Sequence, residues 1–180
     1  MVVDPPSAAH FIAGYTRLLA EVHRQSGDKP YAQRLEMLAA ARESINANPA
    51  LIDAVAASLL ANGQAVAPDV LHAVRTLRFK QWIFLRDTRT YSVFLEPDAN
   101  HAYAVLGLTD RIRNIVGGAA IAIQAGVVEY RGRYVCDGLI VNPIWLGSNL
   151  KREFNAALSY LKKQGRFHVV CAPSQATPYK

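Results

Sequence analysis

The spacing of apolar residues changes once along this chain, after Arg78, and no other feature constrains the fold as much. Before that point, apolar residues recur every three or four positions, which is the spacing of one helix face. After it, apolar and polar residues alternate in several segments, as they do in half-buried strands. Helices first and strands later predict an α+β fold rather than alternating α/β units.

Charge and aromatic content change at nearly the same place. Residues 1–72 hold five Lys or Arg against seven Asp or Glu, whereas residues 73–180 hold fifteen against seven. Only three aromatic residues precede this boundary and thirteen follow it. The net charge of +6 therefore comes from the second part, which is where we expect an anionic partner to bind.

The first part contains four amphipathic segments that predict four helices. Ser7 is the expected cap of the first helix, and residues 28–30 are the expected start of the second. Asn48-Pro49 opens the third, and residues 67–69 open a shorter fourth. None of these helices can bury its apolar stripe alone, so they must pack on each other or on the second part of the chain.

The second part predicts strands at 79–86, 90–96 and 101–107 in an antiparallel meander, then a short helix at 111–116. A long strand over 119–130, with a bulge as the usual interpretation of Gly126, leads to a two-residue turn at 131–132. A strand over 133–141 ends at Asn142-Pro143, a helix is capped by Ser148 or Asn149, and a last strand covers 167–172. We therefore expect a bent antiparallel sheet or partly open barrel of six to seven strands with one covering helix.

The two parts are expected to form one structural unit over residues 1–180. The helical part covers residues 1–78, and the antiparallel β part with its one helix covers 79–175. No Pro/Gly/Ser-rich linker separates them, because the predicted fourth helix runs almost directly into the first strand.

Several common chemistries lack their sequence signatures. Neither a GxxxxGK[ST] nor a GxGxxG loop occurs, the GxSxG serine motif is missing, and no two histidines stand two to four positions apart. We predict no cofactor and no metal. The chain shows no signal peptide and no apolar stretch long enough to cross a bilayer, so we expect no membrane partner and a cytoplasmic location.

The leading functional hypothesis is a non-catalytic binding module for an anionic partner, RNA or DNA first, or another polyanion. Arginine forks bind phosphate in a bidentate manner, and aromatic rings can stack on bases. Two arginines lie between two tyrosines at the hairpin tip 130–134, and Arg86 and Arg89 flank another predicted tip. The predicted ligand-binding residues are Arg86, Arg89, Tyr130, Arg131, Arg133 and Tyr134.

A second hypothesis is a small enzyme that uses Asp137 as acid or base. Alternation places Asp137 among apolar neighbours, where a carboxylate is costly unless it is paired, hydrogen-bonded or exposed. Cys136 and His168 are weaker catalytic candidates, since a nearby imidazole could activate the thiol. We favour a structural explanation for Asp137: a salt bridge to an arginine on a neighbouring strand, or exposure at a bulge near Gly138. For Cys136 we favour a buried, inert thiol.

A third hypothesis assigns the protein to protein–protein interaction. In that case the helical part would present an apolar groove or a homo-oligomer interface. The sequence alone does not choose among the three.

Overall fold

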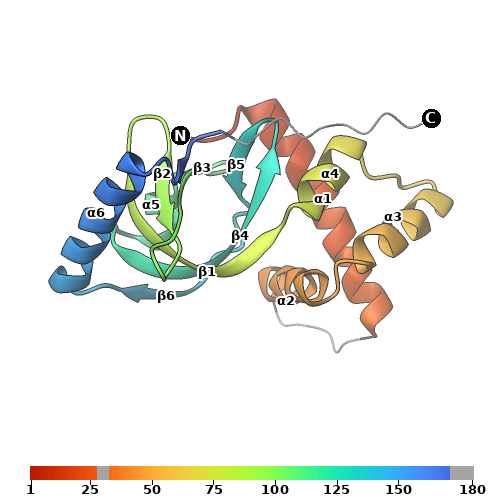
Figure 1. Ribbon diagram of the computed structural model, residues 1–180. Coiled ribbons are helices and arrows are strands. Elements are labelled where there is room, and N and C mark those ends of the chain that lie inside the picture. Colours follow the sequence, from red (N-terminus) through yellow and green to blue (C-terminus); the bar gives the residue numbers. More distant parts are fainter. Residues whose placement is uncertain (28–32, 171–180) are drawn as a thin grey trace.

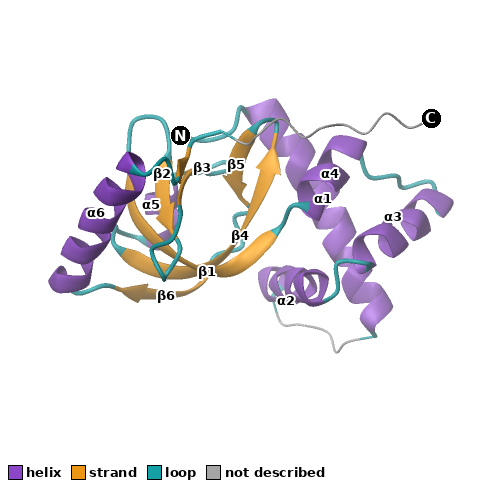
Figure 2. Cartoon of the chain, viewed as in Figure 1, coloured by secondary structure: helices purple, strands orange, loops and turns teal. Residues whose placement is uncertain are grey.

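The computed structural model describes residues 1–27 and 33–170, which form six helices and a seven-stranded mixed sheet (Figure 1; Figure 2). The helices are α1 (Pro5–Ser26), α2 (Arg34–Ala47), α3 (Leu51–Ala61), α4 (Pro68–Arg75), α5 (Ile112–Val116) and α6 (Ser148–Lys163). The strands are β1 (Arg78–Asp87), β2 (Ser92–Leu95), β3 (Ala102–Leu106), β4 (Ile121–Tyr130), β5 (Arg133–Cys136), β6 (Val141–Trp145) and β7 (Phe167–His168). Four helices thus precede the first strand, and the predicted α+β class is confirmed.

Five of the strands close into a ring. β1 pairs with β2, β2 with β3, β3 with β5, β5 with β4, and β4 again with β1. β6 extends the sheet from β4, and β7 extends it from β3. The predicted bent or barrel-like sheet is confirmed, but β3 pairs in parallel with β5 and β7. Parallel pairing needs a long crossover, and the segments that contain α5 and α6 provide it.

The first helix is capped by Asp4 and not, as predicted, by Ser7. The backbone N–H of Ser7 donates to Oδ1 of Asp4 at 3.0 Å. Pro5 and Pro6 occupy the first helical positions, where a missing N–H costs nothing. The predicted start of the second helix at residues 28–30 lies outside the described residues, in which α2 begins at Arg34.

One apolar core joins the helices to the barrel. It contains buried residues from α1 to α4, such as Phe11 and Leu18, together with Val128, Tyr130 and Val135 from β4 and β5. Figure 1 shows α1 to α4 gathered on one side of the barrel. This shared core holds the two parts of the chain against each other.

A second core fills the barrel. Alternate residues of its strands point inward, among them Trp82, Phe94 and Ile123, and α5 adds Ile112 and Val116. The short helix thereby closes one end of the barrel. Even the indole N–H is satisfied inside, since Nε1 of Trp82 donates to the carbonyl of Ala125 at 3.0 Å.

The remaining helix, α6, covers the outer surface of the barrel. Leu158 and Leu161 pack there on a third apolar cluster that includes Leu85, Val93 and Leu95 from β1 and β2. This confirms the single covering helix. The predicted cap at position 148 or 149 is wrong, because Gly147 is the N-cap and no side chain caps the helix.

The strand predicted at 133–141 is interrupted. β5 ends at Cys136, and Gly138 has a φ of 79°, a left-handed conformation that breaks a strand. The chain then forms β6, which includes Pro143 instead of ending before it; a proline is tolerated there because β6 lies at the edge of the sheet. The last predicted strand is reduced to β7, and its residues beyond 170 lie outside the described residues.

Candidate functional sites

The β4–β5 turn, predicted as the centre of a ligand site, packs against the helices. Arg131 donates a hydrogen bond to the Ser7 hydroxyl, and its Nη2 lies 3.8 Å from a carboxylate oxygen of Asp69. Tyr130 is buried, with its ring centroid 5.1 Å from that of Phe11. These contacts tie the turn to α1 and α4.

The other two predicted residues of this turn point elsewhere. Tyr134 is buried in the barrel, with its ring 5.2 Å from that of Tyr103 in an edge-to-face arrangement. Arg133 is exposed and lines a hollow with Val2 and Thr90. The ligand-binding role of the turn stays a prediction, and the burial of both tyrosines leaves its arginines as the accessible groups.

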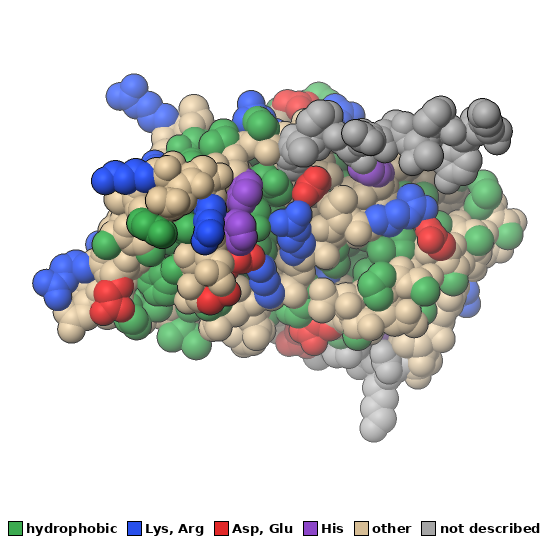
Figure 3. All heavy atoms as spheres, in the orientation of Figure 1, with side chains coloured by type: hydrophobic (Ala, Val, Ile, Leu, Met, Phe, Trp, Pro, Cys, Tyr) green, Lys and Arg blue, Asp and Glu red, His purple; other side chains and the backbone are tan. Residues whose placement is uncertain are grey.

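The β1–β2 turn, in contrast, meets α6. Arg86 donates a hydrogen bond to Oδ1 of Asn155, while Arg89 is exposed in the turn. Lys151 and Arg152 are exposed near the start of α6, as its fourth and fifth residues. We refer to Arg86, Arg89, Lys151 and Arg152 as the α6 basic surface. Figure 3 shows Lys and Arg side chains projecting from this end of the molecule, where α6 lies in Figure 1.

The α6 basic surface lacks acid partners among the described residues, as do some other exposed arginines such as Arg34, Arg111 and Arg133. Its four side chains form no ion pair with any residue in the ranges 1–27 and 33–170. Elsewhere, a carboxylate lies within 4 Å of each of Arg24, Arg42, Arg75, Arg78, Lys80 and Arg131. The first turn of α6 also has no acidic residue and no side-chain cap, so its positive dipole end adds to this charge.

An exposed tryptophan lies shortly before the start of α6. Trp145 ends β6, just before α6, and is 62% exposed. It pairs with Ile121 of β4, which faces the barrel core, whereas α6 packs on the outer surface of the barrel. Nε1 of Trp145 lies 3.3 Å from the position that a Cβ on Gly118 would take, so the indole lies over the loop after α5. Trp145 lies in a loop in the predicted arrangement and is not among the predicted ligand-binding residues.

Asp137 lies at the joint between the barrel and the helices, fully buried and paired with Arg42. Nη1 of Arg42 lies 3.1 Å from Oδ2 of Asp137, and both side chains are 0% exposed. The hydroxyl of Tyr15 donates to the same oxygen at 3.3 Å. Backbone N–H groups of Gly126 and Leu139 donate to Oδ1 at 3.2 and 3.1 Å. The expected arginine is present, but it comes from α2 rather than from a strand.

Burial raises the pKa of Asp137, while Arg42 and the two backbone N–H groups act in the opposite direction. Burial, followed by the charge of Asp137, raises the pKa of Tyr15 well above its usual value, so its hydroxyl keeps the proton that it donates. Arg42 also donates to the carbonyl of Leu139, and the ring of Phe79 lies 4.0 Å from its Cζ. The remaining donors of Arg42, Nε and Nη2, are buried without a partner among the described residues.

Gly126 makes room for this ion pair. A Cβ at this position would lie 2.3 Å from Oδ2 of Asp137 and 2.7 Å from Cδ1 of Leu77. β4 runs through Gly126 without a bulge, so a close approach, rather than a change of register, explains the glycine.

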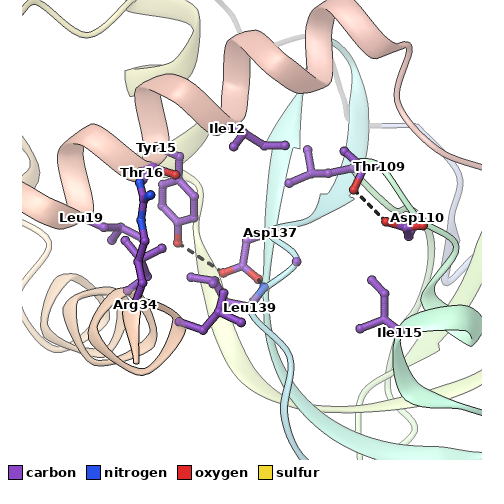
Figure 4. A pocket seen from close by; sticks show the side chains of 14 residues that line it. Ile12, Tyr15, Thr16, Leu19, Arg34, Thr109, Asp110, Ile115, Asp137 and Leu139 are labelled. Atoms are coloured by element: carbon purple, nitrogen blue, oxygen red, sulfur yellow. Dashed lines mark hydrogen bonds between the residues drawn. The ribbon is translucent and has the colours of Figure 1, made fainter. Parts of the chain in front are cut away.

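The ion pair borders a cavity of about 500 Å³, shown in Figure 4. α1, α2, α5 and the loops after β3 and β5 form its walls, which are mainly apolar. Asp137 lines this cavity, but Arg131 and Arg133 do not. The structure therefore does not bring the predicted acid and the predicted arginines together in one concave site.

The three catalytic candidates, Asp137, Cys136 and His168, do not form a hydrogen-bonded unit. The bonds of Asp137 with described residues go to Tyr15, Arg42, Gly126 and Leu139. Cys136 is buried in the barrel core, and burial raises its thiol pKa to about 12, which keeps the sulfur protonated. His168 contacts other residues. The enzyme hypothesis stays an untested prediction.

His168 of β7 lies next to a second histidine, His101, which precedes β3. Nε2 of His168 lies 3.0 Å from Nδ1 of His101, and its ring stacks on Tyr103 with centroids 5.0 Å apart. Arg78 donates to the Tyr103 hydroxyl at 3.3 Å. On the face in Figure 3, histidine lies between basic and acidic side chains. Because these histidines are far apart in the sequence, no local spacing could predict their contact.

We expect the histidine pair to make folding pH-dependent. Burial, His101 and Arg78 lower the pKa of His168, whereas Glu96 opposes this shift. The unfolded chain therefore binds a proton more readily, and the free energy of unfolding should fall as the pH drops below about 6.5. Urea unfolding at pH 7.5 and 5.0 measures this loss of free energy of unfolding. The loss between the two pH values should be smaller in His168→Phe, which keeps a stacking ring, than in the parent. An unchanged loss would contradict this assignment; His72→Gln in α4 is the control.

Within residues 1–27 and 33–170, no three His, Cys, Asp or Glu side chains are grouped so that they could hold a metal ion. Among the helices in those ranges, none combines the length and apolarity needed to cross a bilayer.

Comparisons of the chain with known protein families, with curated proteins and with solved structures find no match. The α6 basic surface carries four exposed basic side chains without acid partners among the described residues. The cavity beside Asp137 has a volume of about 500 Å³ and mainly apolar walls.

Proposed function

We propose that this protein binds single-stranded RNA or DNA through the α6 basic surface. The observation that carries this proposal is the group of four exposed basic side chains without acid partners among the described residues. Lys and Arg that are not neutralised by carboxylates can replace the counterions of a phosphate backbone. Arg86 and Arg89 were predicted from the sequence; Lys151 and Arg152 extend the surface along α6.

The position of Trp145 favours a single strand over a duplex. Unpaired bases expose their faces and stack on aromatic rings, whereas bases in a duplex are already stacked. Trp145 is exposed three residues before the start of α6, while Tyr130 and Tyr134 are buried. A strand with its phosphates along Lys151 and Arg152 would have a base within reach of this indole.

The barrel architecture is compatible with this function but does not establish it. Five-stranded barrels include folds that bind oligonucleotides and oligosaccharides. Since one fold serves many functions, the proposal depends on the side chains of the α6 basic surface.

The direct test is fluorescence anisotropy with a labelled single-stranded oligonucleotide across a salt series. At about 50 mM salt we expect binding that weakens linearly in log–log form as salt rises. Lys151→Gln combined with Arg152→Gln should reduce the affinity and lower the salt slope by about 2, one for each lost phosphate contact. Trp145→Ala should weaken binding by roughly 1–3 kcal/mol with little change in this slope.

The matched control is the pair Arg24→Gln and Arg75→Gln, which removes the same charge from the helical part. Both arginines are exposed and paired with carboxylates, so we expect a small change in affinity. The proposal fails if the parent protein does not bind at low salt, or if the two double variants weaken binding equally. Preference for duplex over single strand would contradict the role of Trp145.

A further inference from the structure

The cavity in Figure 4 is the middle part of a longer groove. A neighbouring hollow of about 490 Å³ shares Ile12, Leu108 and Thr109 with it. A smaller hollow of about 120 Å³ shares Leu35 and Leu139. We refer to the three hollows together as the α1 groove. It follows α1 from Pro5 to Leu19, which is about 21 Å at 1.5 Å per residue.

Several apolar side chains that line the α1 groove are exposed to solvent. Val2, Ile12, Leu35 and Ile115 line it and are 38%, 36%, 66% and 45% exposed. Contiguous apolar surface of this kind is uncommon in a protein without a partner and marks a binding site. The middle hollow alone, at about 500 Å³, has the size of a small-molecule site.

The charged groups on the middle hollow are arranged asymmetrically. Figure 4 shows Arg34 on one side, Thr109 and Asp110 on the other, and Asp137 between them. Arg34 makes no hydrogen bond or ion pair with a residue in the described ranges, whereas Asp110 accepts a bond from the Thr109 hydroxyl at 3.0 Å. Asp137 is already satisfied by its own donors. A cation is therefore available on one side of the middle hollow, whose walls are mainly apolar, while Glu36 lines the smaller hollow.

We propose that the α1 groove binds an amphipathic carboxylate, with its head group on Arg34 and its extended apolar chain lying toward Leu108 and Ile115. A guanidinium binds a carboxylate through two parallel hydrogen bonds, which fixes the head. Placing the head at Arg34 also keeps it away from Asp110. The chain covers apolar side chains that are otherwise wet, and this burial supplies most of the affinity.

The probe is laurate, a twelve-carbon carboxylate, titrated below its micelle concentration into the full chain by isothermal calorimetry. We expect saturable binding of one molecule. Arg34→Gln should weaken it on the order of tenfold, as expected for loss of a charged hydrogen bond. Dodecylamine, with the same chain and the opposite charge, should bind more weakly than laurate.

Leu35→Glu and Leu60→Glu form a matched pair, because these leucines are 66% and 65% exposed but only Leu35 lines the groove. Neither substitution touches the core, so both variants should fold. Laurate binding should be lost in the first and kept in the second. Absence of laurate binding, equal loss in both variants, or equal affinity for dodecylamine would overturn the proposal. So would a dimer in light scattering that Leu35→Glu dissociates, since a second copy would then fill the groove. The α6 basic surface is separate, so the oligonucleotide result does not bear on this test.

Discussion

Arg42→Leu should destabilise the protein by about 3–5 kcal/mol, because it leaves the buried carboxylate of Asp137 without its cation. Both side chains are completely buried, so water cannot take the place of the lost partner. The same change removes the donor to the Leu139 carbonyl and the cation over the Phe79 ring. In urea unfolding, the midpoint should fall strongly while the slope stays close to that of the parent.

A double-mutant cycle separates the ion pair from simple loss of packing. Asp137→Asn keeps an oxygen for the N–H groups of Gly126 and Leu139 but removes the charge. Arg42→Leu should therefore cost about 1–3 kcal/mol less in the Asp137→Asn background than in the parent. Arg75→Leu is the control: its salt bridge with Asp53 is exposed, so its loss should cost less than about 1 kcal/mol. Equal effects of Arg42→Leu and Arg75→Leu would contradict this account.

Gly126→Ala adds a single methyl group, but it should lower the free energy of unfolding by about 3 kcal/mol or more, nearly as much as Arg42→Leu. The new Cβ would overlap Oδ2 of Asp137, and that carboxylate is fixed by its four donors and cannot move aside without losing them. Thermal and urea unfolding of this variant measure the loss directly.

Gly147→Ala provides the comparison for Gly126→Ala. No atom lies within 4 Å of its added Cβ, and its φ of −66° suits any residue, so the change should stay within about 1 kcal/mol. In an Asp137→Ala background, Gly126→Ala should cost clearly less than in the parent, because the overlapping oxygen is gone. If the cost is the same in both backgrounds, the glycine is needed for another reason.

The helices and strands could be predicted from local sequence patterns, but the tertiary contacts of their residues could not. Helical spacing located α1, α3 and α4, and alternation located β1 to β4, since both periods report only which residues face a core. Alternation also predicted that Asp137 needed a partner. It could not identify Arg42, which comes from a helix 95 positions earlier and is selected by the packing of α2 on the barrel.

The predicted ligand-binding residues also show that the sequence does not reveal tertiary contacts. Arginines at two hairpin tips look alike in the sequence, but the β4–β5 tip meets α1 and α4, whereas the β1–β2 tip meets α6. Trp145 was overlooked because its exposure depends on β6, and the interruption at Gly138 that makes β6 a separate strand has no strong local signal. Tertiary contacts, not residue type, distinguish the accessible arginines from the neutralised ones.

The position of β3 has a consequence for folding kinetics. Besides β2 and β5, this strand and the glycine after it bind segments from both extremes of the sequence: Val2 bridges Gly107, and Phe167 pairs with Ala102. A nascent chain cannot complete these pairings until residue 168 has left the ribosome. Contacts over so long a separation form slowly, since loop-closure entropy must be overcome first. We therefore expect the helices to form early, and residues 102–103 of β3 to lack their β7 partner until residues 167–168 have been synthesised.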